Sequence, residues 1–189
     1  MRLAALDVGP PPLPQLDTPW SVRLCDADDS GDVDLVHRWM HAPHIAAAWK
    51  QAWPRERWQT VLAQQLTGDH TRPLIACYEG QPLAYLEVYR VARDVLASHY
   101  PPGLTPHPHD LGVHIAIGDP TRIGKGLGRR LLDAVSRGLF VADPACIRIV
   151  AEPNVRNAAA VASFSAAGFT RHGDVQLPHK TAAFMVRSR

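Results

Sequence analysis

Short runs of alternating hydrophobic and polar residues recur along the chain, and this period of two is the pattern of half-buried β-strands. Such runs predict about seven strands, at 20–25, 73–78, 82–90, 110–117, 146–151, 169–176 and 181–187. The tight turn Glu79-Gly80-Gln81 joins the second and third of them into a hairpin. The run 146–151 is almost entirely apolar, which favours a central position in the sheet.

Apolar residues at helical spacing predict about four helices between these strands. The first helix follows the N-cap residues of 28–32 and runs to about His41, and the second begins at Pro54 and stops at Gly68. The third begins at about Gly126, and the fourth spans 156–167 before Gly168. The resulting order predicts an α+β fold with a mixed central sheet over 20–189. Residues 1–19 are rich in proline and show no period, so we expect a flexible tail or an extended arm lying on the domain.

Composition and charge narrow the class of protein. With 189 residues, 46% of them hydrophobic, the chain is long enough to bury a proper core. A formal net charge of +2 gives no reason to expect nucleic acid as a partner. No apolar run approaches the length of a membrane span and the N-terminus does not resemble a signal peptide, so we expect no membrane partner and a cytoplasmic location. The three cysteines are far apart in apolar stretches, as expected of reduced core thiols.

A glycine-rich turn, Arg122-Ile-Gly-Lys-Gly-Leu-Gly128, follows the predicted strand 110–117 and leads into an amphipathic helix. Backbone N–H groups at a helix N-terminus are unpaired and carry partial positive charge, and glycine lets the backbone approach a phosphate closely. Basic side chains surround the same point, namely Arg122, Lys125, Arg129 and Arg130. A glycine-rich connector with solvated cations is the alternative, but the position between a strand and a helix favours an anion site.

This turn resembles the coenzyme A-binding motif of the GNAT N-acyltransferases, Arg/Gln-x-x-Gly-x-Gly/Ala. The usual Arg or Gln of that motif falls on Ile123, with Arg122 one residue earlier. The resemblance implies the GNAT fold, in which strands four and five splay apart, and acyl-CoA (acetyl-CoA or another) as co-substrate. It also implies that strand four and the turn bind this co-substrate, through Ile115, Ala116, Ile117, Arg122, Ile123, Gly124, Lys125, Gly126, Leu127, Gly128 and Arg129.

A second segment, Glu152-Pro-Asn-Val-Arg-Asn157 with the residues up to Phe169, resembles the strand-to-helix stretch of the same family. The resemblance implies that Asn157 contacts the coenzyme A arm. Phe164 lies where many members have a tyrosine that protonates the leaving thiolate. Phenylalanine has no proton to donate, so the acid is another group or water, or none is needed.

Further segments resemble the lysine, hydroxylysine and hydroxyornithine acyltransferases of hydroxamate siderophore biosynthesis. They are 41–44, 49–53, 86–89, 92–94, 99–100, 110–114 and 177–180, within a resemblance that covers about 20–187. It implies acyl transfer to the amine or N-hydroxyamine of a small diamine or diamino acid, which forms a siderophore hydroxamate for iron acquisition. Hydroxylysine, hydroxyornithine and hydroxycadaverine stay open as acceptors, and so does the acyl chain.

His114 and Glu152 are the candidate catalytic residues. The resembled enzymes carry a histidine before the coenzyme A turn and an acid at the end of the next strand, and these positions fall on His114 and Glu152. Across splayed strands the two side chains would face one another, and a histidine with a carboxylate partner can accept a proton from a nitrogen nucleophile. A lone histidine within a strand is more often structural, but its place beside the turn favours catalysis. We expect direct attack in a ternary complex, because no cysteine lies near the motifs.

The resemblance also suggests residues on the acceptor side. Candidate substrate-binding residues are His44, Trp49, Trp53, Glu87, Tyr89, Asp110 and His179. Tryptophans at this spacing also suit core or lid packing. His107, His109 and Asp110 in a proline-rich loop are weak evidence for a metal site, and we expect no metal.

Two other functions stay open. An aminoglycoside N-acetyltransferase shares the scaffold, but a polycationic acceptor calls for a pocket rich in carboxylates. Segments 41–53 and 176–181 contain none, whereas 87–110 contains Glu87, Asp94 and Asp110. A non-catalytic coenzyme A-binding module would not need His114 paired with Glu152. A monomer or homodimer is expected by default.

Overall fold

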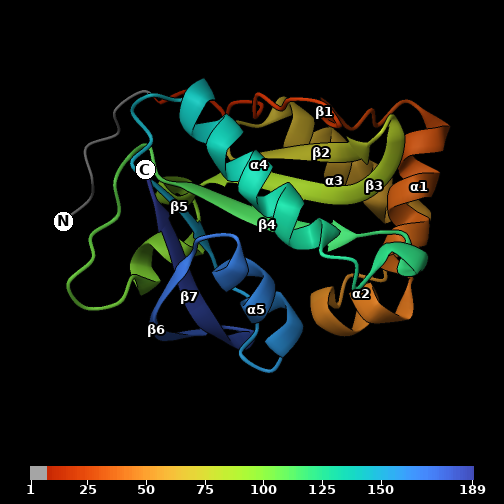
Figure 1. Cartoon of the computed structure of the whole chain (residues 1–189). Helices are drawn as coiled ribbons and strands as arrows, with labels where there is room; N and C mark the ends of the chain where they lie inside the picture. The colour runs from red at the N-terminus through yellow and green to blue at the C-terminus, as the bar shows by residue number, and fades with distance from the viewer. Residues whose placement is uncertain (1–7) are drawn as a thin grey trace.

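Within residues 8–189, which the computed structural model describes, seven strands pair in one sheet in the order β1-β2-β3-β4-β5-β7-β6 (Figure 1). The strands are β1 (Trp20–Leu24), β2 (Thr71–Tyr78), β3 (Gln81–Arg90), β4 (Leu111–Ile117), β5 (Arg148–Ala151), β6 (Thr170–Leu177) and β7 (Lys180–Ser188). Each coincides with one of the predicted runs to within a few residues. The alternating pattern and the predicted mixed sheet are therefore confirmed.

The same residues form five α-helices, and the sequence pattern misses one of them. The helices are α1 (Ser30–Met40), α2 (Pro43–Trp49), α3 (Arg55–Thr67), α4 (Leu127–Ala142) and α5 (Ala158–Ala166). Three short 3-10 helices are η1 (Val91–Arg93), η2 (Val95–His99) and η3 (Pro120–Arg122). The missed helix, α2, has only two turns, which is too short for a helical period to stand out.

Strands β4 and β5 run parallel, and the other neighbouring strands of the sheet are antiparallel. The parallel pairing is short, because only Leu111↔Ile149 and Gly112↔Val150 are in register. Beyond Gly112, β4 stays paired with β3 as far as Ile117, while its other edge has no partner strand within residues 8–189. The two strands thus diverge, as predicted for strands four and five.

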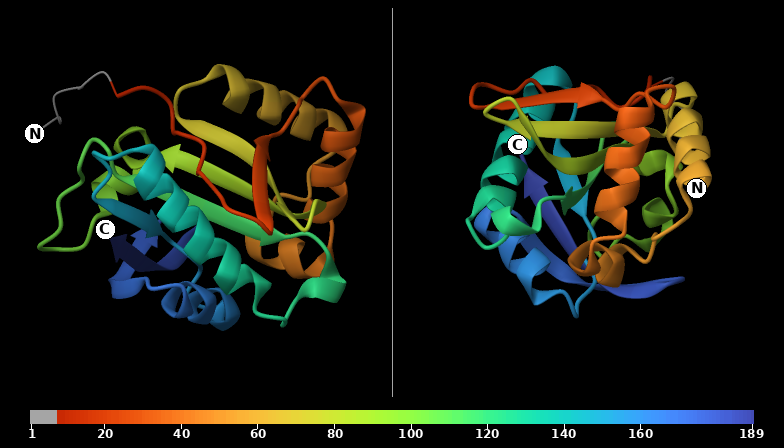
Figure 2. Two further views of the ribbon diagram at one scale, coloured as in Figure 1. Left: turned by 45° about the horizontal axis from the view of Figure 1, so that its top comes forward. Right: turned by 90° about the vertical axis from the view of Figure 1, so that its right-hand side faces the viewer.

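Helices cover both faces of the sheet (Figure 2). The apolar stripe of α4 and Phe164 of α5 share one buried cluster with residues of β2, β3 and β4. On the opposite face, Val36 of α1, Ile45 of α2 and Trp58 of α3 share a second cluster with Tyr85 of β3. Because side chains alternate along a strand, every second residue of β3 and β4 faces α2 and α3.

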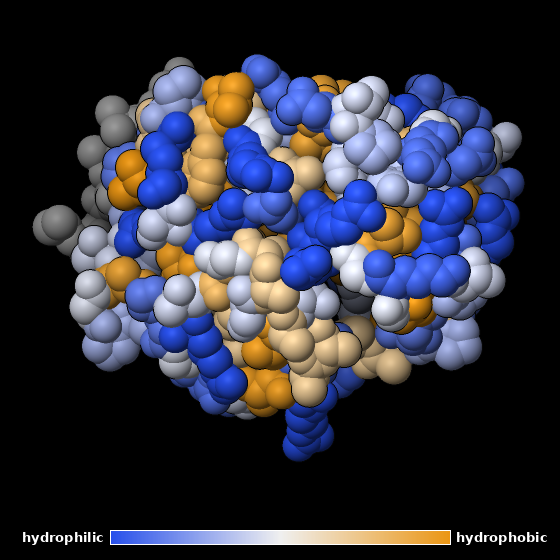
Figure 3. Space-filling view, viewed as in Figure 1, coloured by the Kyte–Doolittle hydropathy of each residue, from blue (hydrophilic) through white to orange (hydrophobic). Residues whose placement is uncertain are grey.

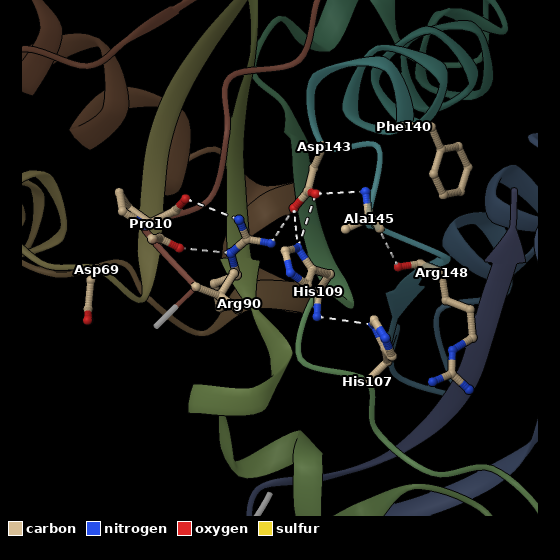
Figure 4. Close-up of polar contacts among 12 residues, drawn as sticks. Pro10, Asp69, Arg90, His107, His109, Phe140, Asp143, Ala145 and Arg148 are labelled. Carbon is tan, nitrogen blue, oxygen red and sulfur yellow. Dashed lines mark hydrogen bonds and ion pairs between the residues drawn. The ribbon is translucent and has the colours of Figure 1, made fainter. Parts of the chain in front are cut away.

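Residues 8–19 form an extended arm along the domain. Arg90 is 5% exposed, and its guanidinium donates to the carbonyls of Gly9 and Pro10 at 3.0 and 3.3 Å and to Asp143 at 2.7 Å (Figure 4). Farther along, the Gln15 N–H donates to a carbonyl of α4 at 3.2 Å. Over 8–19 these contacts favour the extended arm over a flexible tail. The part of that prediction that concerns residues 1–7 lies outside the described residues.

Candidate active site

The register of β3 and β4 places Glu87 and His114 side by side. They are directly opposite partners, and opposite residues in an antiparallel pair point to the same face of the sheet. The Glu87 carboxylate accepts hydrogen bonds from His114 Nδ1 at 2.9 Å, from Gln65 of α3 at 2.8 Å and from the Tyr85 hydroxyl at 3.0 Å. Glu87 is only 9% exposed. It is therefore a buried carboxylate behind His114.

Glu152 approaches His114 from the other side of the gap. It directly follows β5, and its Oε1 lies 2.5 Å from His114 Nε2. Its Oε2 accepts a hydrogen bond from the Tyr89 hydroxyl at 2.8 Å, and Lys180 Nζ of β7 lies 3.7 Å from Oε1. The structure thus brings the two predicted catalytic residues together across the point where β4 and β5 diverge.

Carboxylates on both sides stabilise His114 as a cation. Burial opposes the charge of the ring, but Glu152 and Glu87 outweigh it and raise the pKa of His114 to about 10. Burial also opposes the charge of Glu152, yet His114, Lys180 and Tyr89 lower the pKa of that carboxyl to about 2. Burial of Glu87 is likewise outweighed by the bond from His114, so its pKa is lowered. At neutral pH these groups form a carboxylate–imidazolium–carboxylate arrangement, which we call the Glu87–His114–Glu152 triad.

Tyr89 reaches Glu152 because residue 112 is a glycine. A Cβ at Gly112 would lie 1.9 Å from Cζ of the tyrosine ring, so a larger residue would displace the ring. The Tyr89 ring is 2% exposed and lies 4.9 Å from the His114 ring between centroids. Burial and the negative charge of Glu152 raise the pKa of Tyr89 well above its ordinary value, which keeps the hydroxyl a donor. The structure thus places Tyr89 as a support of the triad.

Aromatic residues around α2 and α3 flank the triad. The Trp49 ring lies 5.8 Å between centroids from both His114 and Tyr85. The Trp53 ring instead packs on Trp58, at 5.1 Å between centroids. Of the two predicted substrate-binding tryptophans, Trp49 is therefore the one that borders the triad.

The unpaired edge of β4 leads into the glycine-rich turn. Residues 115–117 bond to β3 on one side, so their remaining backbone groups can bind an extended ligand in the gap. One of these groups already has a partner, because His44 Nε2 of α2 lies 2.8 Å from the Ile117 carbonyl oxygen. His44 is thus placed at the end of β4, next to the turn.

The turn itself presents an uncapped helix N-terminus. Gly124 and Gly126 have φ angles of 75° and 72°, in the left-handed region that favours glycine. Gly126 begins α4 without a side-chain cap, so the first backbone N–H groups of the helix are free to bind an anion. Lys125 and Arg129 are exposed, and Arg122 lies 3.7 Å from Asp119. Charge and free donors therefore coincide at this point.

Other predicted cofactor-binding residues have structural partners of their own. Asn157 is the N-cap of α5, where its side chain accepts a hydrogen bond from Ala160 N at 3.1 Å. Phe164 and Leu127 belong to the buried core, in which Phe164 packs on Phe169 at 5.1 Å. Of the remaining turn residues, Ile123 is exposed and Gly128 lies in the first turn of α4.

The outer side of α5 exposes small residues, which form the pale apolar area at the lower centre of Figure 3.

The structure does not bring Asp110 to the triad. Asp110 is fully buried, pairs with Arg148 at 2.8 Å and accepts a hydrogen bond from the Tyr100 hydroxyl at 2.8 Å. His179 lies in the turn between β6 and β7, beside Lys180. Burial and the charge of Lys180 lower the pKa of His179, which therefore stays neutral at pH 7.

Among residues 8–189, no set of three His, Cys, Asp or Glu side chains is arranged to hold a metal ion. His109 instead lies 3.1 Å from Asp143 in the cluster around Arg90 (Figure 4). In the same part of the chain, none of the helices combines the length and apolar character that crossing a membrane requires.

Sequence reasoning misses Gln65 and Tyr85, which both contact Glu87. It includes Lys180 only as part of the resembled segment 177–180, without its contact with Glu152. Tyr85 could have been found, because it alternates with Glu87 and Tyr89 along one strand and so shares their face. Gln65 comes from α3 and Lys180 from β7. Their contacts with the triad depend on how distant elements pack, and no local pattern indicates these contacts.

A protein-family profile described as an acetyltransferase (GNAT) domain matches residues 28–177. This match includes the triad, the free edge of β4 and the glycine-rich turn. The chain belongs to the GNAT acetyltransferase family. The resemblance that the turn indicates is thereby confirmed.

Curated relatives narrow the comparison within the GNAT family. The lysine N-acyltransferase MbtK of Mycolicibacterium paratuberculosis is 41% identical over 150 residues, which are 79% of this chain and 65% of the relative. MbtK of Mycobacterium sp. (strain MCS) is 36% identical over a match that covers 95% of this chain and 71% of that relative. The N(6)-hydroxylysine O-acetyltransferase of Escherichia coli is 29% identical over a match that covers 86% of this chain and 50% of that relative. These matches thus cover between 50% and 71% of the relatives' own length.

Solved structures share the GNAT fold throughout. An uncharacterized protein from Bacillus halodurans superposes with a TM-score of 0.82 at 32% identity, over 94% of this chain and 90% of the other. The aminoglycoside acetyltransferase AAC(6')-Ib in complex with coenzyme A superposes with a TM-score of 0.76 at 27% identity, over 90% of this chain and 95% of the other. The predicted scaffold is therefore present in full.

Proposed function

We propose that this GNAT enzyme transfers an acyl group from acyl-CoA to the amine or N-hydroxyamine of a small diamine or diamino acid. Hydroxylysine, hydroxyornithine and hydroxycadaverine are the candidate acceptors, and the product is a siderophore hydroxamate used in iron acquisition. Relatives named lysine N-acyltransferase and N(6)-hydroxylysine O-acetyltransferase support this acceptor class. The observation that carries the proposal is the contact of His114 with Glu152 beside the free edge of β4. We propose a cytoplasmic monomer or homodimer.

Acyl-CoA would bind between the diverging strands and the turn. The backbone of residues 115–117 would hold the extended arm, and the uncapped N-terminus of α4 would hold the pyrophosphate. Lys125, Arg129 and Arg122 would add charge at the same anion. A structural neighbour that contains coenzyme A supports this assignment.

The carboxylates of segment 87–110 argue against a polycationic acceptor. Glu87 is occupied by His114, Asp94 by His70 at 3.2 Å, and Asp110 by Arg148. A pocket for an aminoglycoside would need carboxylates without such partners. This pairing favours a small acceptor over the aminoglycoside alternative, although the same scaffold serves both.

The proposed reaction is direct attack on the thioester. The acceptor nitrogen forms the C–N bond while the C–S electron pair leaves on the coenzyme A sulfur, and backbone N–H groups of β4 hold the carbonyl oxygen. The proton that nitrogen loses passes to Glu152 and then to solvent, which returns one proton to the thiolate. His114 stabilises Glu152 and the charge that develops beside it.

Release of coenzyme A, measured with a thiol reagent, tests the proposal. Acetyl-, succinyl- and long-chain acyl-CoA would be combined with N-hydroxylysine, N-hydroxyornithine, N-hydroxycadaverine, lysine and an aminoglycoside. We expect release that depends on one of the first four acceptors. Release with the aminoglycoside alone would transfer the chain to the aminoglycoside-modifying enzymes, and coenzyme A binding without release would favour a non-catalytic module. A His114→Ala/Glu152→Gln double variant with normal coenzyme A binding and full turnover would contradict the assigned catalytic residues.

A further inference from the structure

The two nitrogens of His114 both face carboxylates. Nδ1 lies 2.9 Å from Glu87 Oε2 and Nε2 lies 2.5 Å from Glu152 Oε1. An ionised carboxylate can only accept a hydrogen bond, so each contact requires a proton on the facing ring nitrogen. With both nitrogens protonated, the ring has no lone pair with which to take a further proton.

We propose that Glu87 makes the site selective for an acceptor nitrogen that is uncharged at neutral pH, an N-hydroxyamine, by holding His114 as a fixed cation. This inference rests on the proposed function and concerns which of its two acceptor classes is used. Glu87 is a positioning residue, because it acts through His114 and lies on the side of the ring away from Glu152.

The surroundings of the ring keep this charge state in place. From β3, Tyr85 donates to Glu87 and Tyr89 donates to Glu152. From β7, Lys180 lies 3.7 Å from Glu152 and so favours its ionised form. Trp49 of α2, whose next residue is Lys50, contributes an uncharged ring edge. His179 is the neutral imidazole of this neighbourhood, and no hydrogen bond among the described residues connects it to the triad.

A fixed cation at His114 affects two acceptors differently. A lysine ε-amine has a pKa of about 10.4 and arrives as an ammonium ion that must lose a proton before it can attack. His114 is already protonated, and the strongly acidic Glu152 is too weak a base to deprotonate an ammonium. An N-hydroxyamine is less basic and largely neutral at pH 7, so it can attack at once. Its nitrogen becomes acidic only after the C–N bond has formed, when Glu152 can accept the proton.

The location of Glu87 makes this role separable from catalysis. Glu87 lies behind His114 and is held by Gln65 and Tyr85, whereas Glu152 faces the gap. Glu87→Gln keeps the size of the side chain and one acceptor oxygen, but it removes the charge and turns the second oxygen into a donor N–H2 group. Tyr85→Phe is the matched control, because it removes one hydrogen bond to the same carboxylate and leaves the charge.

The test compares lysine with N6-hydroxylysine as acceptors between pH 6 and 9.5, at a saturating concentration of the best acyl-CoA. In the wild type, we expect kcat/KM for lysine to rise about tenfold per pH unit with no plateau below pH 9, as an unassisted ammonium requires. For N6-hydroxylysine we expect kcat/KM to be flat above pH 7. Glu87→Gln should shrink the ratio of the two kcat/KM values at pH 7 by about tenfold or more, because the pKa of His114 falls when one carboxylate is removed. Tyr85→Phe should leave the ratio within about twofold of the wild type.

A direct readout accompanies the kinetics, namely the ring resonances of His114 in an NMR titration. We expect a charged ring up to pH 9 in the wild type and in Tyr85→Phe, and a lower titration midpoint in Glu87→Gln. A wild-type lysine profile that levels off near pH 7 would overturn the inference, since it would reveal a working base such as His179. An unchanged ratio in Glu87→Gln would overturn it as well. Turnover of none of the candidate acceptors, N-hydroxyornithine and N-hydroxycadaverine included, would instead overturn the proposed function, and this inference with it.

Discussion

At the scale of single residues, the position of Glu152 depends on the hydroxyl of Tyr89. We expect Tyr89→Phe to lower the free energy of unfolding by about 1–3 kcal/mol, because a buried carboxylate oxygen loses its donor. We also expect kcat to fall by about tenfold or more, since a displaced Glu152 no longer aligns with His114. Urea unfolding and coenzyme A release at pH 7.5 measure the two effects.

Tyr100→Phe is the matched control for this variant. The Tyr100 hydroxyl also donates to a buried carboxylate at 2.8 Å, that of Asp110, but this pair lies apart from the triad. We expect Tyr100→Phe to lower the free energy of unfolding by a similar amount and to leave kcat nearly unchanged. If both variants reduced kcat equally, Tyr89 would act through general stability and its specific support of Glu152 would be disproved.

The residue scale also shows how far sequence reasoning extends. The meeting of His114 with Glu152 could be predicted, because each residue stands next to a recognisable segment, the turn or the strand-to-helix stretch. The double pairing of His114 could not, because it requires the register that sets Glu87 opposite it. Asp110 illustrates the opposite case, since a carboxylate in a candidate acceptor segment proves to be a fully buried partner of Arg148.

At the scale of elements, long periodic segments were predictable and short ones were not. The amphipathic stripe of α4 identifies that helix, whereas α2 depends on its docking against β4 through His44. The proline content of 1–19 fits both a flexible tail and an extended arm, and only the packing of 8–19 against Arg90 and α4 favours the arm.

The contact of the arm with α4 can be tested at Gly138. Alanine in the middle of a helix is usually more stable than glycine by about 1 kcal/mol, yet a Cβ at Gly138 would lie 2.3 Å from the Gln15 carbonyl oxygen. We therefore expect Gly138→Ala to displace the arm, to speed proteolysis within 8–19 and to yield none of the usual gain in stability. Gly128→Ala is the control, because its methyl group would meet only Ile117, at 3.8 Å. A Gly138→Ala variant that is more stable and equally resistant to protease would show that the arm does not lie there.

At the scale of the whole molecule, the sheet has two parts that meet at β4 and β5. Two residue pairs are in register between these strands, and the ionic contact of His114 with Glu152 lies just beyond them. The triad therefore connects the two parts of the sheet at the place where the substrates are proposed to meet. Its charge state should consequently appear in the stability of the molecule as well as in its chemistry.

This linkage predicts a pH dependence of the free energy of unfolding. The pKa of His114 is raised from 6.5 to about 10, so its contribution is complete below pH 6.5 and is lost as pH rises towards 10. The pKa of Glu152 is lowered from 4.5 to about 2, so its contribution is complete above pH 4.5 and is lost as pH falls towards 2. Their joint contribution should be greatest between pH 4.5 and 6.5. We expect the free energy of unfolding of the wild type, measured by urea denaturation, to fall as the pH rises from 6.5 to 8.5, a range below most cysteine titration. It should fall more steeply than that of His114→Asn/Glu152→Gln, by a slope that corresponds to about one bound proton. Parallel curves for the two proteins would mean that His114 is not held as a cation in the folded state.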